Sequence, residues 1–309
     1  MSDVARLPPG VAVLERGWLS SNNVVFANGV TAVVDTGYGT HAGQTLALVQ
    51  RALGGAGLQL VVNTHLHSDH CGGNVVLQAA YPEARTLIPP GQADAVSRWD
   101  EGELSYVATG QSCAQFRFDD LLRPGALVRL GESDWQVHAA PGHDPHSVIL
   151  FEPKERVLIS ADAMWENGFG VVFPELDGER AFDEVGATLD VIEALRPDVV
   201  IPGHGRPFGG SQSITGAINR ARSRLSGFVA DPRRHASHAM KVLVKFKLLE
   251  WQRVDFEAFV RWADAMPYMR RVHTRYFNAA PFGEWLASLT AELVKSGAVG
   301  REGPIVYNI

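Results

Sequence analysis

The sequence predicts an α/β fold that ends in a small, mainly helical region. Over residues 1–210, short apolar segments typical of strands alternate with segments of helical periodicity, and polar residues follow several strands. Beyond Gly210 the alternation stops and helical periodicity dominates. With 46% hydrophobic and 20% charged residues among 309, the composition is that of an ordinary globular protein.

The first part of the chain supplies the predicted strands and two of the predicted helices. The helices are expected over Ala42–Leu53, which Gly54 and Gly55 close, and over Ala181–Leu195. Strands are expected, in order, over Val11–Leu14, Thr31–Val34, Leu58–Val62, Trp135–Ala139, Ser147–Phe151, Val157–Ile159 and Val199–Ile201. This order favours one α/β domain over residues 1–230.

The remainder predicts a second domain over residues 231–309. A helix is expected over Ile214–Ala230, and Pro232 breaks it, because proline disfavours a helical conformation in the residue before it. Three helices and a final turn and strand are expected beyond the break, over His235–Leu249, Asp255–Ala265, Phe282–Ser296 and Arg301–Ile309. Three helices followed by a strand suggest a small winged-helix-like module.

The net charge of -6 conceals an asymmetry between the two parts. Residues 1–210 hold 13 Lys and Arg against 26 Asp and Glu, whereas residues 211–309 hold 15 against 8. A basic tail can contact an anionic partner such as nucleic acid, or it can be a solvated helical surface beside an acidic domain. We favour the second interpretation, because the tail lacks interleaved aromatic and basic residues.

The sequence also indicates the cellular location of the protein. No apolar run approaches the roughly 20 residues that a membrane span needs. Met1–Gly10 has an early Asp3 and lacks the apolar core of a secretory signal. The two cysteines, Cys71 and Cys113, exclude a disulfide scaffold. We therefore expect a cytoplasmic protein without a membrane partner.

The strongest chemical signal is a cluster of three histidines and an aspartate directly after the Leu58–Val62 strand. It comprises His65, His67, Asp69 and His70. Imidazole and carboxylate are ligands that suit zinc, iron and manganese. Because His65 and His67 are two residues apart, an extended segment points both side chains the same way. The cluster therefore predicts a metal site.

Three further candidates stand where predicted strands end. They are His143, Asp162 and His204, each close behind a strand and two of them directly after a glycine. Sites in α/β sheets form outside the carboxyl ends of the strands, so these side chains are expected to converge. Together with the histidine cluster they supply a complete set of metal ligands.

This ligand order resembles that of the metallo-β-lactamase superfamily over about residues 10–210. The resemblance implies an αββα sandwich, with the segment Val33-Val34-Asp35-Thr36-Gly37 as the family's early aspartate motif. It also implies two divalent metal ions, with zinc the default and iron or manganese possible. The implied ligands are His65, His67 and His143 for the first ion, Asp69, His70 and His204 for the second, and Asp162 as the bridge. Asp35 is then expected to brace the metal-binding loop.

Because Asp162 stands at the position of the bridging aspartate, the site resembles the glyoxalase II, lactonase and nuclease branches of the superfamily. Cys71 directly follows His70 but is interpreted as a small buried hydrophobe and not as a ligand. Ala161 replaces a common glycine, and Asp144 replaces the usual serine or threonine after the Gly-His. His146 can face the substrate or simply hold a loop. Trp165, Phe169 and Phe173 can line a substrate pocket or pack in the core.

The expected function is hydrolysis of an ester, thioester or lactone by a hydroxide that two metal ions share. Asp69 is the expected catalytic residue, since as a ligand it can also orient the nucleophile or receive its proton. One alternative is a nuclease whose basic tail binds RNA, and another is a non-enzymatic binding protein that retains the fold. A small-molecule substrate is favoured over nucleic acid. The substrate's identity and the oligomeric state stay open.

Overall fold

The computed structural model describes residues 7–309, and its chain divides into two compact units. One unit contains the residues up to Leu104 and those from Ser112 to Ser226, and the other contains Ser105–Gln111 and Gly227–Ile309. The prediction that Met1–Gly10 is not a secretory signal concerns residues that lie mostly outside the described range. Each unit is described by itself.

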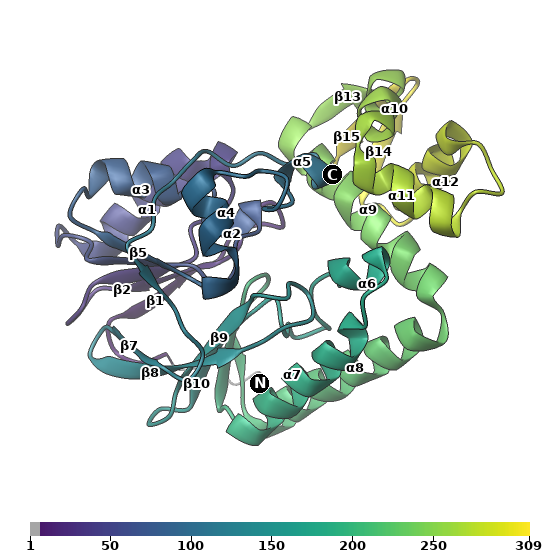
Figure 1. Ribbon diagram of the computed structural model, residues 1–309. Coiled ribbons are helices and arrows are strands. Elements are labelled where there is room, and N and C mark those ends of the chain that lie inside the picture. The colour runs from purple at the N-terminus through teal and green to yellow at the C-terminus, as the bar shows by residue number, and fades with distance from the viewer. Residues whose placement is uncertain (1–6) are drawn as a thin grey trace. The chain divides into compact units, whose positions relative to one another are not determined.

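The first unit contains two sheets, whose strands Figure 1 labels. The first sheet has the order β1-β2-β3-β4-β5-β6, antiparallel from β1 to β3 and parallel from β3 to β6. Its strands are β1 (Val11–Leu14), β2 (Asn23–Phe26), β3 (Ala32–Val34), β4 (Leu60–Val62), β5 (Arg85–Ile88) and β6 (Asp120–Leu121).

The second sheet has the order β12-β11-β10-β9-β8-β7. Only β10 and β11 run parallel to each other as neighbours; the remaining neighbours in this sheet are antiparallel. Its strands are β7 (Leu127–Leu130), β8 (Ser133–Ala139), β9 (Val148–Glu152), β10 (Val157–Ala161), β11 (Val199–Pro202) and β12 (Phe208–Gly209).

The core lies between the two sheets because successive strand residues point to opposite faces. Val24 and Phe26 of β2 pack into a cluster with side chains of the second sheet, such as Trp135. Val25, between them, belongs instead to a cluster with Val49 of a covering helix. Full burial of each such side chain stabilises the fold by about 1.5–3 kcal/mol.

Helices cover the outer faces of the sandwich. Figure 1 shows α1 (Ala42–Leu53) and α3 (Asn74–Ala80) over the first sheet, and α7 (Ala181–Leu195) and α8 (Ser211–Ala230) beside the second. The predicted bounds of α1 and α7 are confirmed. Gly54 ends α1 at a φ of 59°, where glycine has no side chain to strain. The αββα layering expected for the first unit is therefore present.

Short helices occupy the connections of this unit. They are η1 (Gly39–His41), α2 (Ser68–Cys71), η2 (Pro90–Gln92), α4 (Ala93–Arg98) and α6 (Phe173–Asp177). None of them was predicted from sequence, nor were strands β2, β5, β6, β7 and β12. Most are too short to show a periodic pattern.

The strand ends bring the chemical residues together. Asp35 follows β3, and the histidine cluster follows its parallel neighbour β4. In the second sheet, Asp162 follows β10 and His204 lies beyond the end of its parallel neighbour β11. Parallel strands end at the same edge, so each pair of connections emerges on one side of its sheet.

The second unit combines helices with a three-stranded sheet of order β13-β15-β14. Its elements are α5 (Tyr106–Thr109), α9 (Pro232–Trp251), β13 (Arg253–Asp255), α10 (Phe256–Ala265), α11 (Pro267–Tyr276), α12 (Phe282–Lys295), β14 (Val299–Glu302) and β15 (Ile305–Asn308). The helical C-terminal region that was expected is present, and it ends in the β14–β15 hairpin; the winged-helix-like interpretation stays a prediction.

The prediction of three helices after the break was wrong by one, because α11 was missed. Its buried side chains include Tyr268, Met269, Val272 and His273, of which only Val272 is an aliphatic residue of the kind that makes a periodic pattern conspicuous. Asp255, predicted as the first residue of α10, is instead its N-cap: the carboxylate accepts hydrogen bonds from two backbone amides of the first turn.

Within residues 7–309, we find no helix that combines the length and apolarity needed to cross a bilayer.

Candidate metal centre

The loop after β4 is fixed from two sides before its histidines reach the site. The backbone amide of Asn63 donates to Leu87 of the neighbouring strand, and its side chain exchanges hydrogen bonds with the amide of Asn74. Leu66 is buried at 1% exposure between two histidines. His65 and His67 therefore point together away from Leu66, as the spacing of two predicts.

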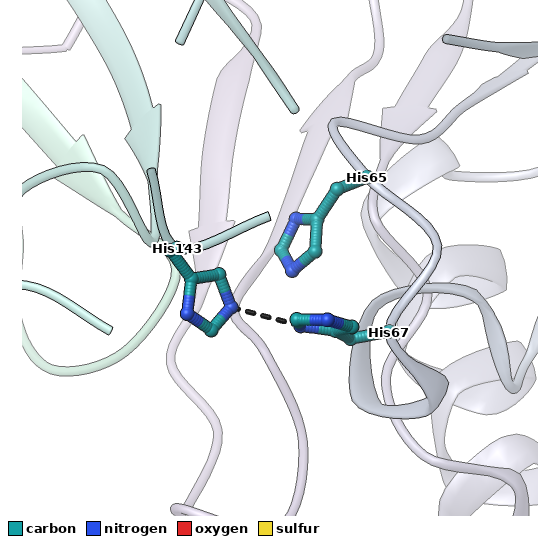
Figure 2. A group of neighbouring side chains, drawn as sticks. All are labelled: His65, His67 and His143. Atoms are coloured by element: carbon teal, nitrogen blue, oxygen red, sulfur yellow. Dashed lines mark hydrogen bonds between the residues drawn. The ribbon is translucent and has the colours of Figure 1, made fainter. Parts of the chain in front are cut away.

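The first group of candidate ligands is His65, His67 and His143, whose nearest nitrogens all lie within 4.8 Å of one another. Figure 2 shows His143 approaching the two other rings from the opposite side. Nδ1 of His67 lies 2.8 Å from Nε2 of His143. Three imidazoles that converge in this way can hold one metal ion.

The second group is Asp69, His70 and His204, whose nearest ligand atoms likewise lie within 4.8 Å of one another. The one-turn helix α2 directs Asp69 and His70 inward. Nε2 of His204 lies 3.1 Å from Oδ2 of Asp69, and Nε2 of His70 lies 3.8 Å from the same oxygen. Two imidazoles and a carboxylate can hold a second ion.

Asp162 lies between the two groups. Its Oδ2 is 3.5 Å from Nε2 of His143 in the first group and 3.8 Å from Nε2 of His204 in the second. Its Oδ1 is 3.5 Å from Nε2 of His70 and accepts a hydrogen bond of 3.1 Å from the indole of Trp165. This carboxylate is therefore positioned to touch ions in both groups.

Most of the histidines use their second ring nitrogen to contact the protein. Nδ1 of His143 lies 2.5 Å from the carbonyl oxygen of Val171, and Nδ1 of His65 lies 3.1 Å from the hydroxyl of Thr64. Nδ1 of His70 lies 2.8 Å from Oδ2 of Asp35. Such contacts fix the tautomer and leave the opposite nitrogen free to bind a metal.

Asp35 organises the loop as expected. Its carboxylate accepts hydrogen bonds from the backbone amide and the hydroxyl of Thr64, in addition to its contact with His70. Asp35 is 3% exposed and has a φ of 58°, which is a left-handed conformation that few non-glycine residues adopt. The bracing role predicted for Asp35 is confirmed.

Two glycines leave room for these side chains. A Cβ atom on Gly203 would collide with Oδ1 of Asp162 and would lie 3.0 Å from Cε1 of His70. A Cβ atom on Gly170 would collide with Nδ1 of His143. The backbone thus approaches the candidate ligands so closely that no larger residue fits without displacing them.

Burial sets the charge state of the first group. It lowers the pKa of His67 and of His143 to about 4, and lowers the pKa of His65 well below its usual value. These rings are therefore neutral at pH 7, as metal ligands must be. Burial opposes ionisation of Asp162, but the neighbouring His204 and His70 hold its pKa well below the usual range.

The donor set fits divalent metal ions. Nε2 of His65 is buried and has no hydrogen-bond partner among residues 7–309, although it faces the other two histidines of its group. A buried polar atom of this kind normally requires a partner, and a metal ion supplies one. The ligands would be His65, His67 and His143 for one ion and Asp69, His70 and His204 for another, with Asp162 between them.

The cysteines stay outside both ligand groups. The thiol of Cys71 is fully buried and lies within hydrogen-bond range of the carbonyl oxygens of Leu66 and His67. Its sulfur lies 3.8 Å from that of Cys113, without a disulfide. Neither thiol occurs in the described groups of potential ligands, which agrees with the interpretation of Cys71 as a small buried residue.

Aromatic rings border both groups. Phe173 lies edge-on to His67, with ring centroids 5.5 Å apart, and Trp165 lies edge-on to His204 at the same separation. Trp18, which was not predicted from sequence, stacks on His204 at 5.5 Å and is 57% exposed. The only signal in the sequence was its position two residues before the polar Ser20–Asn23 segment.

The other residues considered from sequence lie elsewhere. His146 is exposed in the loop after His143, and its backbone amide donates to Oδ1 of Asp144. Phe169 is buried at 2%, so the core interpretation holds for it. The aromatic residues that contact candidate ligands, and that can meet a substrate, are Trp18, Trp165 and Phe173.

Sequence comparison agrees with this geometry. The sequence pattern of the Metallo-beta-lactamase superfamily matches residues 16–204. The chain is 28% identical over 178 residues to the human acyl-coenzyme A thioesterase MBLAC2, which covers 52% of this chain and 61% of that protein. It is 31% identical over 119 residues to a hydroxyacylglutathione hydrolase of Francisella tularensis, which covers 38% of each. The chain thus spans less than two thirds of these relatives.

Solved structures share the fold at low sequence identity. A metallo-beta-lactamase family protein from Thermus thermophilus aligns over 98% of this chain and all of that one, with a TM-score of 0.58 and 20% identity. TTHA1623, solved in a di-iron-bound form, aligns over 68% of this chain and 98% of that one, with a TM-score of 0.54 and 24% identity.

Proposed function

This chain belongs to the metallo-β-lactamase superfamily, and from that premise we propose that it is a metal-dependent hydrolase of thioesters. The observation that carries the proposal is the position of Asp162 between two groups of three candidate ligands. The thioester is chosen over the ester and the lactone because two relatives are named as an acyl-coenzyme A thioesterase and a hydroxyacylglutathione hydrolase.

Metal ions at the two groups would lower the pKa of bound water and polarise the carbonyl oxygen of the substrate. The residues around them then have separate tasks. Asp69 is the candidate catalytic residue, because its side chain is 13% exposed whereas that of Asp162 is 7% exposed. A carboxylate that reaches the substrate side can receive the proton that the attacking water must lose.

Trp165 holds Asp162 in place through its indole N–H, and its own position is fixed by a backbone hydrogen bond to Gly168. Phe173 covers the rings of His67 and His143, which keeps water from one side of the first group. The faces of Trp18 and Trp165 offer apolar surface beside the second group. An acyl chain can bury apolar area there.

The nuclease alternative is disfavoured by the lysines of α9, which already have partners. Lys241 forms an ion pair with Glu292, and Lys247 pairs with Glu250. Lys245 donates to the carbonyl oxygens of Ala298 and Ile309 and to the side chain of Asn308. These charges are therefore largely engaged within the second unit.

The helix just before the hairpin also lacks the expected charge for nucleic acid. In a winged-helix-like module it is the helix in the position to enter a groove. The exposed residues of α12 include Glu284, whose carboxylate repels phosphate, and Glu292, whose charge is paired with that of Lys241. Short RNA should consequently bind weakly, and that binding should show a shallow salt dependence.

Metal analysis and a substrate panel test the proposal. Purified protein should hold about two divalent ions per chain. It should hydrolyse acyl thioesters faster than lactones, phosphodiesters or β-lactams, and Asp162→Asn should lose metal and activity together. Asp183→Asn, at an exposed carboxylate paired with Arg180, is the matched control and should change neither. Protein that binds no metal, or a phosphodiester preferred over every thioester, would overturn the proposal.

A further inference from the structure

A buried carboxylate stands behind one of the candidate ligands of the first group. Asp144 directly follows His143 and is 4% exposed. Its Oδ2 lies 3.6 Å from Nε2 of His67, which is within ion-pair range and just beyond a hydrogen bond. Its Oδ1 accepts a hydrogen bond of 2.7 Å from the backbone amide of His146.

The two nitrogens of His67 have different surroundings. Nδ1 faces Nε2 of His143 at 2.8 Å, inside the first group, whereas Nε2 faces the carboxylate of Asp144. If Nδ1 binds a metal ion, the ring proton must lie on Nε2, because a neutral imidazole carries one proton. That proton points toward Asp144.

The second group shows the same arrangement with another carboxylate. Oδ2 of Asp35 lies 2.8 Å from Nδ1 of His70, whose Nε2 faces Asp69 and Asp162. Each group thus has one histidine with a buried aspartate at its outer nitrogen. Both carboxylates are buried, with Asp35 3% and Asp144 4% exposed.

We propose that Asp144 is a positioning residue for the first metal ion, acting through His67 as Asp35 acts through His70. This inference rests on the proposed metal-dependent function. The carboxylate orients the His67 ring, fixes its tautomer and makes Nδ1 a stronger donor. The first group, which contains three neutral imidazoles and only the shared Asp162 as an anion, gains a second nearby negative charge.

A purely structural role must be separated from this one, because Asp144 also closes the turn at His146. An asparagine at position 144 retains a side-chain oxygen for the amide of His146 but removes the charge. A serine likewise can close the turn. Alanine removes both functions. The loop role predicts that only Asp144→Ala has an effect, and the positioning role predicts that all three substitutions have one.

The test measures metal binding without any substrate. Affinities for Zn²⁺ and Co²⁺ are determined by chelator competition for the wild type, Asp144→Asn, Asp144→Ser and Asp144→Ala, together with unfolding of each metal-free protein. Asp144→Asn should lower the affinity for one of the two ions about 10- to 100-fold and change the affinity for the other by less than about 3-fold. It should alter the visible absorption of bound Co²⁺ while the metal-free protein unfolds as the wild type does.

One further variant identifies which ion is affected, and another serves as a control. In a His143→Ala background, which disables the first group, Asp144→Asn should have no additional effect on the ion that remains. Asp134→Asn, an exposed carboxylate paired with Arg129, controls for the loss of a charge. Unchanged affinities and Co²⁺ spectrum in Asp144→Asn would overturn the inference while the proposed function stands. A wild-type protein that binds no metal would overturn both.

Discussion

Buried charged side chains are arranged in opposite ways in the two units. In the first unit, Asp69, Asp162 and the histidines converge on one place, and Nε2 of His65 has no hydrogen-bond partner among the described residues. In the second unit, the buried ammonium of Lys247 pairs with Glu250 and lies 5.3 and 5.2 Å from the ring centres of Trp251 and Trp262. Its charge is neutralised within the unit.

This difference separates two uses of a buried charge. An ionisable group with a partner of opposite sign contributes to a specific packed structure, often at little net gain in stability. A buried ligand atom without a hydrogen-bond partner, such as Nε2 of His65, raises the energy of the metal-free fold, and an ion that binds there would lower it again. The unpartnered nitrogen of His65 in the first unit is therefore consistent with a binding role, and the Lys247–Glu250 pair in the second unit with a structural one.

The largest expected effect comes from filling the space beside Asp162. Gly203→Ala places a methyl group against Oδ1 of Asp162 and close to the His70 ring. We expect metal content to fall and hydrolysis to drop at least about 100-fold, because small displacements of reacting groups carry large costs. Gly43→Ala in α1, where a Cβ atom meets no atom within 4 Å, is the control. Full metal content in Gly203→Ala would contradict the described geometry.

A smaller effect is expected from breaking the ion pair of the second unit. Lys247→Met leaves Glu250 without its partner at a site where the lysine side chain is 6% exposed. Stability measured by denaturant should fall by about 3 kcal/mol while metal content stays constant. The double variant Lys247→Met/Glu250→Leu should recover most of the loss. If the single variant loses metal instead, the proposed division of roles between the units is wrong.

The smallest effect concerns strain beside the metal centre. Ala161 adopts a φ of 46°, in the left-handed region that glycine tolerates best. Ala161→Gly should raise the unfolding free energy by about 0.5 kcal/mol, because relief of strain slightly exceeds the entropy cost of glycine. Ala140→Gly, at a buried position without a positive φ, should lower stability by about 1 kcal/mol. A loss of stability in Ala161→Gly would show that this conformation is not strained.

Sequence alone predicted the features that depend on local pattern. Helices α1 and α7 have strong helical periodicity and clear ends, and both begin and end where expected. The seven candidate ligands were identifiable because each follows a recognisable strand or lies in the dense histidine cluster. The structure brings six of them into two groups and places Asp162 between these groups. Their role as ligands stays a proposal.

Features that depend on tertiary contact were not predictable. Trp18 has no local signal for stacking on His204, which is distant in sequence. Asp144 directly follows a candidate ligand in the sequence, but its approach to the outer nitrogen of His67 depends on the fold. Strand β13, of three residues, becomes visible only through its pairing with β15.

The segment Ser105–Gln111 belongs to the second unit although the rest of that unit begins only at Gly227. Its helix α5 packs against α11, so this contact can form only after residues 267–276 have been made. At about 5–20 residues per second, synthesis reaches α11 roughly 10–30 s after α5. During that interval α5 lacks this contact, and termination near residue 230 would remove the contact permanently.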